Sequence, residues 1–256
     1  MLTYFPPPSP TALTVEWQQP AAVVEVVAYG EGDAVVTVLT AGLGAWRGLA
    51  KGGSSRRGTA VWQPGNLISA RWVARHAEQL GSISGELVHP GAALAMDDRV
   101  NLAVLNAACA VAAGALPERE PHPDAFAGLA RLLAGINIEG AALPTLVLWE
   151  LALLRELGFG LDFSVSAVVG DNDRLAFVSP RTGRAVSLSG AGAWADRLLK
   201  LPAFLLDGSD PDLADALDGL RLTGHFLARD VFGARHRPLP PARERLYNLI
   251  SDRVLE

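Results

Sequence analysis

Residues 44–65, GAWRGLAKGGSSRRGTAVWQPG, place a glycine-rich basic stretch inside a sequence that is otherwise typical of β-strands. The glycines can adopt positive φ and bring backbone N–H groups close to a ligand. Two tryptophans, Trp46 and Trp62, bracket the stretch. They suit base stacking, and they suit the core of a small barrel equally well. The cations of the stretch are Arg47, Lys51, Arg56 and Arg57.

Positive charge is concentrated here although the chain as a whole carries a formal net charge of -5. Residues 34–77 contain no Asp or Glu, and Arg71 and Arg75 add two further cations to that window. A local basic field attracts phosphates even where the net charge of a protein is unfavourable. A solvated, flexible hairpin tip explains the same composition, so the charge pattern alone leaves both interpretations open.

The sequence on either side of the basic stretch predicts β-structure over residues 21–88. A β-branched run at 23–27, closed by a Gly/Asp turn, and a second run at 34–39 are expected to pair as a hairpin. Alternation along 67–74 directs Trp72 to the core and Arg71 to the opposite face. With a last strand at 80–88, about five short strands predict a small closed barrel that carries a basic loop.

From residue 90 onward the apolar residues recur at helical spacing. Helices are predicted to begin near Asp98, at 122–124, at Pro144, at Asp210 and at Ala242. The third of these carries an apolar stripe that includes Trp149, for which core packing is the favoured role, whereas Glu150 and Arg155 lie off that stripe. Residues 171–173 are expected to form a turn, and the runs 175–178 and 184–188 are expected to pair as a hairpin.

No pattern in the chain indicates catalysis, a metal or a cofactor. The single cysteine, Cys109, excludes an intramolecular disulfide and a cysteine-rich zinc site, and the five histidines show no ligand spacing. Acid pairs fall at helix starts and turns, where capping explains them. We therefore predict a protein that is not an enzyme, with no catalytic residue. No apolar run reaches the length of a membrane span.

Three blocks of the sequence, in this order, resemble the RecO family of bacterial recombination mediators. The first comprises GEGDAV at 30–35, LAKGGSSRR at 49–57 and QPG at 63–65. The second is WELALLRELGFGLDF at 149–163, and the third is AFVSPRTGRAV at 176–186. The resemblance extends from about residue 16 to the end of the chain, and the second block is its most specific part.

The resemblance implies an α+β protein in which an N-terminal OB-fold β-barrel precedes an α-helical domain with a small β-hairpin insertion. We expect a proline-rich arm at 1–15, the OB-fold domain at 16–89 and the helical domain at 90–256, with the hairpin segment at 162–190. Some family members carry a four-cysteine zinc site in that segment. Residues 163–188 contain no cysteine, so we expect no metal here.

The resemblance also implies a function: binding of single- and double-stranded DNA, annealing of complementary strands, and loading of RecA together with RecR and the single-stranded-DNA-binding protein. We therefore expect a cytoplasmic protein that associates with the nucleoid during repair, with no membrane partner and no cofactor. An adaptor of the same fold that binds those proteins but has little DNA affinity is the alternative, motivated by the acidic net charge. The residues expected to bind DNA are Lys51, Arg56 and Arg57, then Arg47, Arg71 and Arg75.

Overall fold

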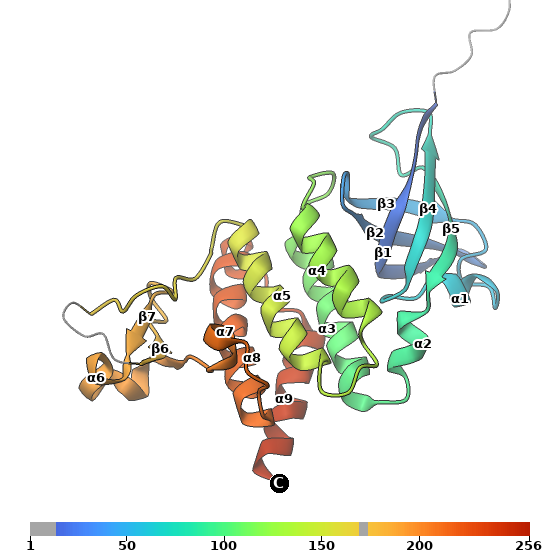
Figure 1. Cartoon of the computed structure of the whole chain (residues 1–256). Helices are drawn as coiled ribbons and strands as arrows, with labels where there is room; N and C mark the ends of the chain where they lie inside the picture. Colours follow the sequence, from blue (N-terminus) through green and yellow to red (C-terminus); the bar gives the residue numbers. More distant parts are fainter. Residues whose placement is uncertain (1–13, 169–173) are drawn as a thin grey trace, which may run out of the picture.

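The computed structural model describes residues 14–168 and 174–256. Strands at one end of the molecule form a barrel, a bundle of helices occupies the middle, and a small second sheet lies at the far end (Figure 1). The α+β class and the order of barrel, helices and β-insertion are therefore confirmed. Most of the expected proline-rich arm, and the expected turn at 171–173, lie outside the described residues.

Five strands wind into the barrel in the order β1-β2-β3-β5-β4, and β4 returns to pair with β1. The seam between β3 and β5 rests on a single parallel pair, Leu49 with Ser82, so the barrel closes at one point and stays open along the rest of that seam. A partly open five-stranded barrel is the form that OB folds take. The strands are β1 (Val15–Tyr29), β2 (Asp33–Thr40), β3 (Gly44–Ala50), β4 (Leu67–Ala74) and β5 (Ser82–His89).

The first strand is much longer than the apolar run at 23–27 predicts. It begins at Val15 and passes through Pro20, because its outer half pairs antiparallel with β4, from Val15 opposite Ala74 to Ala22 opposite Leu67. Residues 15–20 carry little apolar signal, because none of them is fully buried. Long-range pairing, rather than local propensity, extends the strand.

The tryptophans of the basic stretch are core residues of the barrel. Trp46 is 8% exposed and Trp62 7%, and the predicted inward position of Trp72 is confirmed. Trp46 and Trp72 meet edge to face, with their ring centroids 4.8 Å apart. Because these rings are enclosed, Trp46 and Trp62 are core residues, and bases cannot stack on them.

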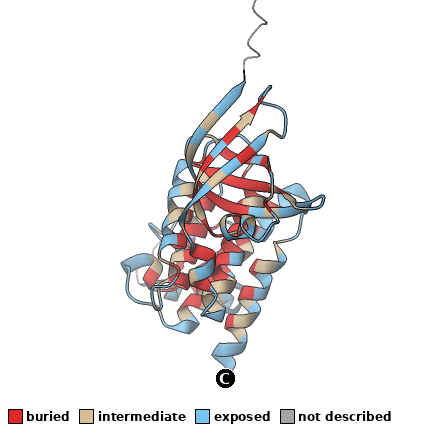
Figure 2. Ribbon diagram, turned by 90° about the vertical axis from the view of Figure 1, so that its right-hand side faces the viewer, coloured by how far each residue is buried: buried red, intermediate tan, exposed pale blue. Residues whose placement is uncertain are grey.

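Helices form the second domain and their buried faces share one core (Figure 2). Asp98 caps α3, its Oδ1 accepting the N–H of Asn101 at 2.7 Å, while Asp212 rather than Asp210 caps α8. The helices are α2 (Gly91–Ala95), α3 (Arg99–Ala115), α4 (Pro123–Ala134), α5 (Ala142–Glu156), α7 (Phe204–Asp207), α8 (Leu213–Phe226), its continuation η2 (Leu227–Phe232), and α9 (Pro241–Leu255).

The expected hairpin exists and is joined by a third strand. Strands β6 (Leu175–Val178) and β7 (Ala185–Ser187) pair antiparallel, and β8 (Leu199–Lys200) pairs with the other edge of β6. The short α6 (Leu188–Ala191) and η1 (Gly192–Arg197) connect β7 to β8. A strand of two residues carries no periodicity, so the sequence pattern does not predict it.

One expectation for α5 is wrong. Trp149 packs in the core, as expected, with its indole N–H donating to the carbonyl of Ala125. Glu150, however, is 0% exposed instead of lying off the buried face. Its carboxylate is buried because Arg243 of α9 reaches it, Nε to Oε1 at 2.6 Å, and because the hydroxyl of Thr223 donates to it as well. A charged residue enters a core when it is paired and hydrogen-bonded there.

Candidate nucleic-acid interface

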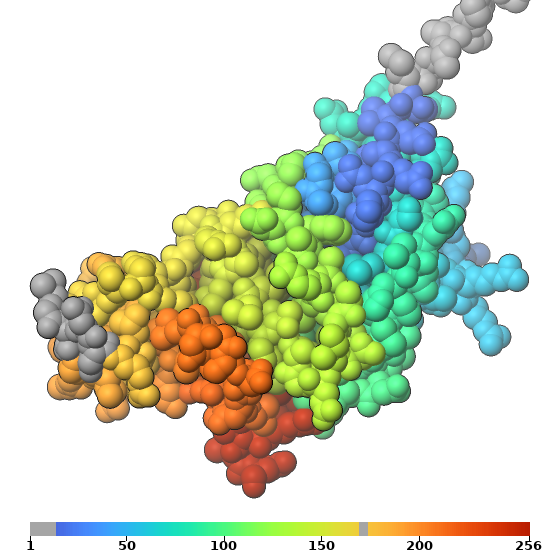
Figure 3. Space-filling model, viewed as in Figure 1, coloured from blue at the N-terminus to red at the C-terminus, as the bar shows by residue number. Residues whose placement is uncertain are grey.

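The strongest candidate interface is the connection that follows β3. Residues 51–57, which we name the basic turn, carry Lys51, Arg56 and Arg57 between the end of β3 and the four-residue helix α1 (Gly58–Val61). The stretch 44–65 is therefore a strand, a turn and a short helix rather than the tip of a hairpin. In Figure 3 this part of the chain, in light blue, projects from the right-hand side of the molecule.

Local hydrogen bonds give the basic turn a defined backbone. The hydroxyl of Ser55 donates to the carbonyl of Gly52 at 2.6 Å and accepts the N–H of Gly58 at 3.1 Å. Gly52 has φ +67°, a conformation in which glycine is favoured. A Cβ on Gly58 would overlap the backbone of Gly52 and Gly53, so the two glycine positions permit the chain to fold back on itself.

The basic turn is also anchored to the turn between β1 and β2. The carboxylate of Asp33 accepts the N–H of Gly52 at 2.7 Å, and the N–H of Ser54 donates to the carbonyl of Gly32 at 2.9 Å. The sequence interpretation treats Gly30–Asp33 only as a turn and misses this role of Asp33. The anchor holds the basic turn in place while its cationic side chains stay exposed.

The six predicted DNA-binding residues do not share one environment. Among residues 14–168 and 174–256, the side chains of Lys51, Arg56, Arg57 and Arg75 take part in no ion pair. Three of these free cations lie together in the basic turn. Arg75 follows β4 in the turn that leads to β5, which stands near the top of the barrel in Figure 1.

The other two predicted residues are already paired with carboxylates. Arg71, on the outer face of β4 as expected, donates through Nε to Glu16 of β1 at 2.6 Å. This hydrogen bond lowers the pKa of the Glu16 carboxyl, and both side chains remain about half exposed. Arg47 lies on β3 with Nη1 3.9 Å from Oε1 of Glu118. Both arginines are therefore weaker candidates for a phosphate contact than the cations of the basic turn.

Glu118 belongs to the connection between α3 and α4, which lies along the open edge of β3. Its backbone forms a parallel bridge with Ala45, and the N–H of Arg119 donates to the Ala45 carbonyl at 2.9 Å. The guanidinium of Arg119 also lies 4.8 Å from the centroid of the Trp46 ring. We name residues 117–121 the strap. The sequence does not indicate this contact, because a one-pair bridge has no sequence pattern.

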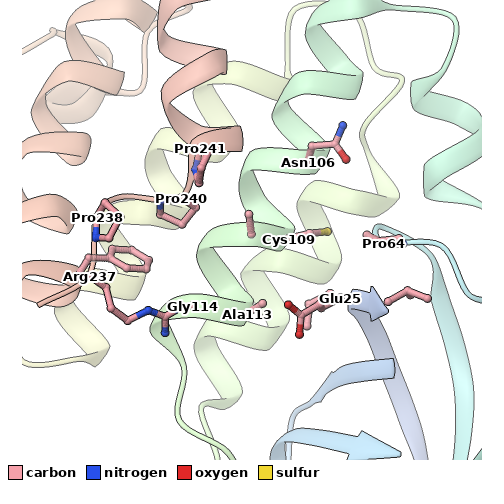
Figure 4. Close-up of a pocket in the computed structure, with 14 residues that line it drawn as sticks. Glu25, Pro64, Asn106, Cys109, Ala113, Gly114, Arg237, Pro238, Pro240 and Pro241 are labelled. Carbon is pink, nitrogen blue, oxygen red and sulfur yellow. The ribbon is translucent and has the colours of Figure 1, made fainter. Parts of the chain in front are cut away.

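A cleft of about 410 Å³ separates the barrel from the helices (Figure 4). Glu25 of β1 lies on one side, Arg237 and prolines 238, 240 and 241 lie on the other, and Cys109 and Gly114 of α3 lie between them. Burial raises the pKa of Cys109 to about 12, against the smaller, opposite effect of a hydrogen bond with the Gly65 backbone. A thiol that stays protonated at neutral pH is a packing group rather than a nucleophile.

Neither a group of metal ligands nor a membrane-spanning helix is found among the described residues. No three His, Cys, Asp or Glu side chains within 14–168 and 174–256 are grouped so that they could hold a metal ion. No helix in that part of the chain is long and apolar enough to cross a membrane. Arg243 of α9 is 1% exposed, so its side chain is not available for contact with a partner protein.

Comparison with known proteins agrees with the geometry. The family model described as "Recombination protein O N terminal" matches residues 14–90, and "Recombination protein O C terminal" matches residues 96–239. The chain belongs to the RecO family. The resemblance carried by the three sequence blocks is thereby confirmed.

Similar RecO proteins cover nearly the whole chain. The protein named DNA repair protein RecO of Acidiphilium cryptum is 64% identical over 244 residues, which is 94% of this chain and 97% of the relative. RecO proteins of Granulibacter bethesdensis and Gluconacetobacter diazotrophicus are 54% and 53% identical, each over 93% of this chain and 96% of the relative.

Proposed function

We propose that this RecO chain is a recombination mediator. It binds single- and double-stranded DNA, anneals complementary strands, and helps to load RecA together with RecR and the single-stranded-DNA-binding protein. The observation that carries the proposal is the basic turn, in which three cations that pair with no carboxylate of the described residues project from an OB-type barrel. We propose that the protein acts in the cytoplasm, on the nucleoid.

Annealing requires no covalent chemistry, and we propose that this protein is not an enzyme. Two complementary strands repel each other through their phosphates. A protein that neutralises phosphates with Lys and Arg lowers this repulsion, while contacts to the backbone leave the base edges free to pair. The exposed cations of the basic turn are suited to this task, and their number limits how many phosphates this surface neutralises.

The test is annealing of two complementary oligonucleotides at low and moderate salt. Wild-type protein is expected to accelerate annealing, and Lys51/Arg56/Arg57→Ala to lose the acceleration. In single-strand binding, the triple variant should flatten the slope of log affinity against log salt by about 2, because each phosphate contact contributes about 0.7. An unchanged slope would remove these residues from the interface.

A matched control separates position from total charge. Arg131, Arg245 and Arg253 are exposed, lie on α4 and α9, and take part in no ion pair of the described residues. Their joint substitution by Ala removes the same three charges from the helical domain. If binding to the basic turn is specific, this control retains both annealing and the salt slope.

A second candidate function is the adaptor that binds RecR or the single-stranded-DNA-binding protein and has little DNA affinity. The net charge of -5 and the pairing of Arg47 and Arg71 with carboxylates favour it. Recovery of either partner in a pull-down, with no DNA complex at low salt, would select the adaptor. DNA binding that the triple variant loses would select the mediator.

A further inference from the structure

The outer face of β1 changes its surroundings at a bulge. Before the bulge, Ala22 and Val24 belong to the core of the helical domain. The register shifts between Val23 and Glu25, and beyond it the outward residues of β1 are not covered. Val27 is 53% exposed and Tyr29 is 58% exposed, whereas Val26, which precedes them, packs against the barrel core. The helices therefore leave one end of this face open.

The uncovered face continues across β2 and β3. The pairing places Val27 opposite Val35, and Val35 opposite Leu49, so that these three residues form one apolar row on the outside of the barrel. Tyr29 stands one row further along, opposite Asp33. The row on the other side is polar: Glu25 is opposite Thr37, and Thr37 is opposite Arg47.

Tyr29 lies at the same end of the barrel as the basic turn. Lys51 directly follows Ala50, which pairs with Ala34 at the start of β2, and Tyr29 closes β1 at that same end. The anchors from Asp33 to Gly52 and from Gly32 to Ser54 fix the two turns to each other. An exposed aromatic ring and three cations that form no ion pair within the described residues are thus held on adjoining turns by these two hydrogen bonds.

We infer that Tyr29 is a stacking platform for a base of single-stranded nucleic acid whose phosphates pair with the cations of the basic turn. This inference rests on the proposed DNA binding and adds a residue that charge alone does not identify. Exposed aromatic rings beside a basic groove are the usual means by which proteins bind single strands without sequence preference.

Two carboxylates next to Tyr29 determine on which side the phosphates of the bound nucleic acid lie. Glu31 is exposed in the turn that follows Tyr29, and Asp33 is half-buried at the start of β2. A phosphate above this turn would be repelled by these two negative charges, whereas an uncharged base would not be repelled. The backbone of the strand therefore lies towards Lys51, Arg56 and Arg57, and a base lies towards Tyr29 and the apolar row.

Stacking of this kind is compatible with annealing. A stacked base uses its flat face, so its pairing edge remains available to a complementary strand, and every base has such a face. Tyr29 would then hold one nucleotide unstacked from its neighbours and presented for pairing. Cations alone would hold the backbone without presenting any base.

The test compares an oligothymidine with an abasic oligonucleotide of equal length, which has the same phosphates but no bases. Loss of one stacked base is expected to weaken oligothymidine binding about 5- to 150-fold in Tyr29→Ala. Binding of the abasic strand should not change, because its contacts are electrostatic. Tyr29→Phe should retain wild-type affinity, whereas Tyr29→Leu, which keeps apolar area without an aromatic ring, should not.

The outcomes separate this inference from the proposed function. If wild-type protein binds neither oligonucleotide, the function and the stacking role fail together. If wild type binds both and Tyr29→Ala matches it on both, the stacking role is wrong while DNA binding stands. Equal loss on both strands would also overturn the stacking role, with thermal unfolding of Tyr29→Phe and Tyr29→Ala used to detect a folding defect.

Discussion

Arg243 of α9 donates to Glu150 of α5 inside the helical domain, with Nε 2.6 Å from Oε1 and Nη2 2.9 Å from Oε2. The same Nη2 also reaches the carbonyl of Leu220 on α8. One guanidinium therefore links α5 to both α8 and α9. Each charge is buried with a partner, and neither has water to replace that partner if it is removed.

Arg243→Met is expected to destabilise the protein by about 3–5 kcal/mol, because it leaves the Glu150 carboxylate buried and unpaired. The measurement is the denaturant midpoint of the helical circular dichroism signal. Adding Glu150→Leu should recover much of the loss, since replacing both charges removes the desolvation cost. A double variant that is less stable than Arg243→Met would show that the core needs the polar network for another reason.

The Glu16–Arg71 pair makes a prediction about pH. The hydrogen bond from Arg71 lowers the pKa of Glu16 below its ordinary value of 4.5. For a carboxyl with a lowered pKa, the favourable pairing is present at higher pH and is lost as pH falls through the folded-state value. Arg71→Gln should therefore raise the pKa of Glu16 towards 4.5, as measured by an NMR titration of the carboxyl carbon.

The same pair predicts how little Arg71 contributes to DNA binding. Because Glu16 already neutralises it, Arg71→Ala should change the salt slope of single-strand binding by less than Lys51→Ala. Glu16→Gln releases the guanidinium and should steepen the slope by up to about 0.7. A large effect of Arg71→Ala alone would mean that DNA displaces the Glu16 carboxylate.

Gly44 and Gly30 form a matched pair for testing how the strap packs on the barrel. Both have positive φ, +72° and +61°, so alanine is strained at either position by roughly 1–2 kcal/mol. At Gly30 a Cβ meets no heavy atom within 4 Å, whereas at Gly44 it would overlap the carbonyl oxygen of Glu120. Gly44→Ala should thus lower thermal stability clearly more than Gly30→Ala, and equal losses would show that the strap moves away easily.

These contacts show which parts of the molecule its sequence predicts. Local signals suffice where they agree with burial, as with the alternation that places Trp72 in the core and with Asp98, which caps α3. It does not suffice where a distant segment decides the environment. Nothing within α5 indicates that Glu150 is buried, because its partner lies 93 residues away on α9.

The candidate interface likewise has features that the local sequence predicts and features that depend on distant segments. The clustering of Lys51, Arg56 and Arg57 is local, so the sequence predicts it. The pairing of Arg71 with Glu16 and of Arg47 with Glu118 depends on barrel closure and on the path of the strap. The position of Tyr29 beside the basic turn depends on hydrogen bonds between two turns, and a Tyr-Gly sequence alone indicates only the end of a strand.

We expect Glu118 of the strap to compete with a DNA phosphate for Arg47. Its Glu118 carboxylate lies 3.9 Å from the Arg47 guanidinium, on the same face of the barrel as the apolar row beside Tyr29. A carboxylate at this distance reduces the attraction of Arg47 for a phosphate, and both side chains are about half exposed, so salt screens the pair. Glu118→Gln should therefore tighten single-strand binding at low salt and steepen the salt slope by up to about 0.7.

A second substitution, at Arg47, tests whether the tighter binding of Glu118→Gln comes from the released Arg47 guanidinium. In the double variant Glu118→Gln/Arg47→Ala the steeper slope should disappear, because the released cation is absent. Glu139→Gln removes one exposed carboxylate from the connection between α4 and α5 and serves as the charge control. If the double variant keeps the gain, or if Glu139→Gln reproduces it, the effect comes from the overall charge of the protein, and Glu118 does not compete with phosphate at Arg47.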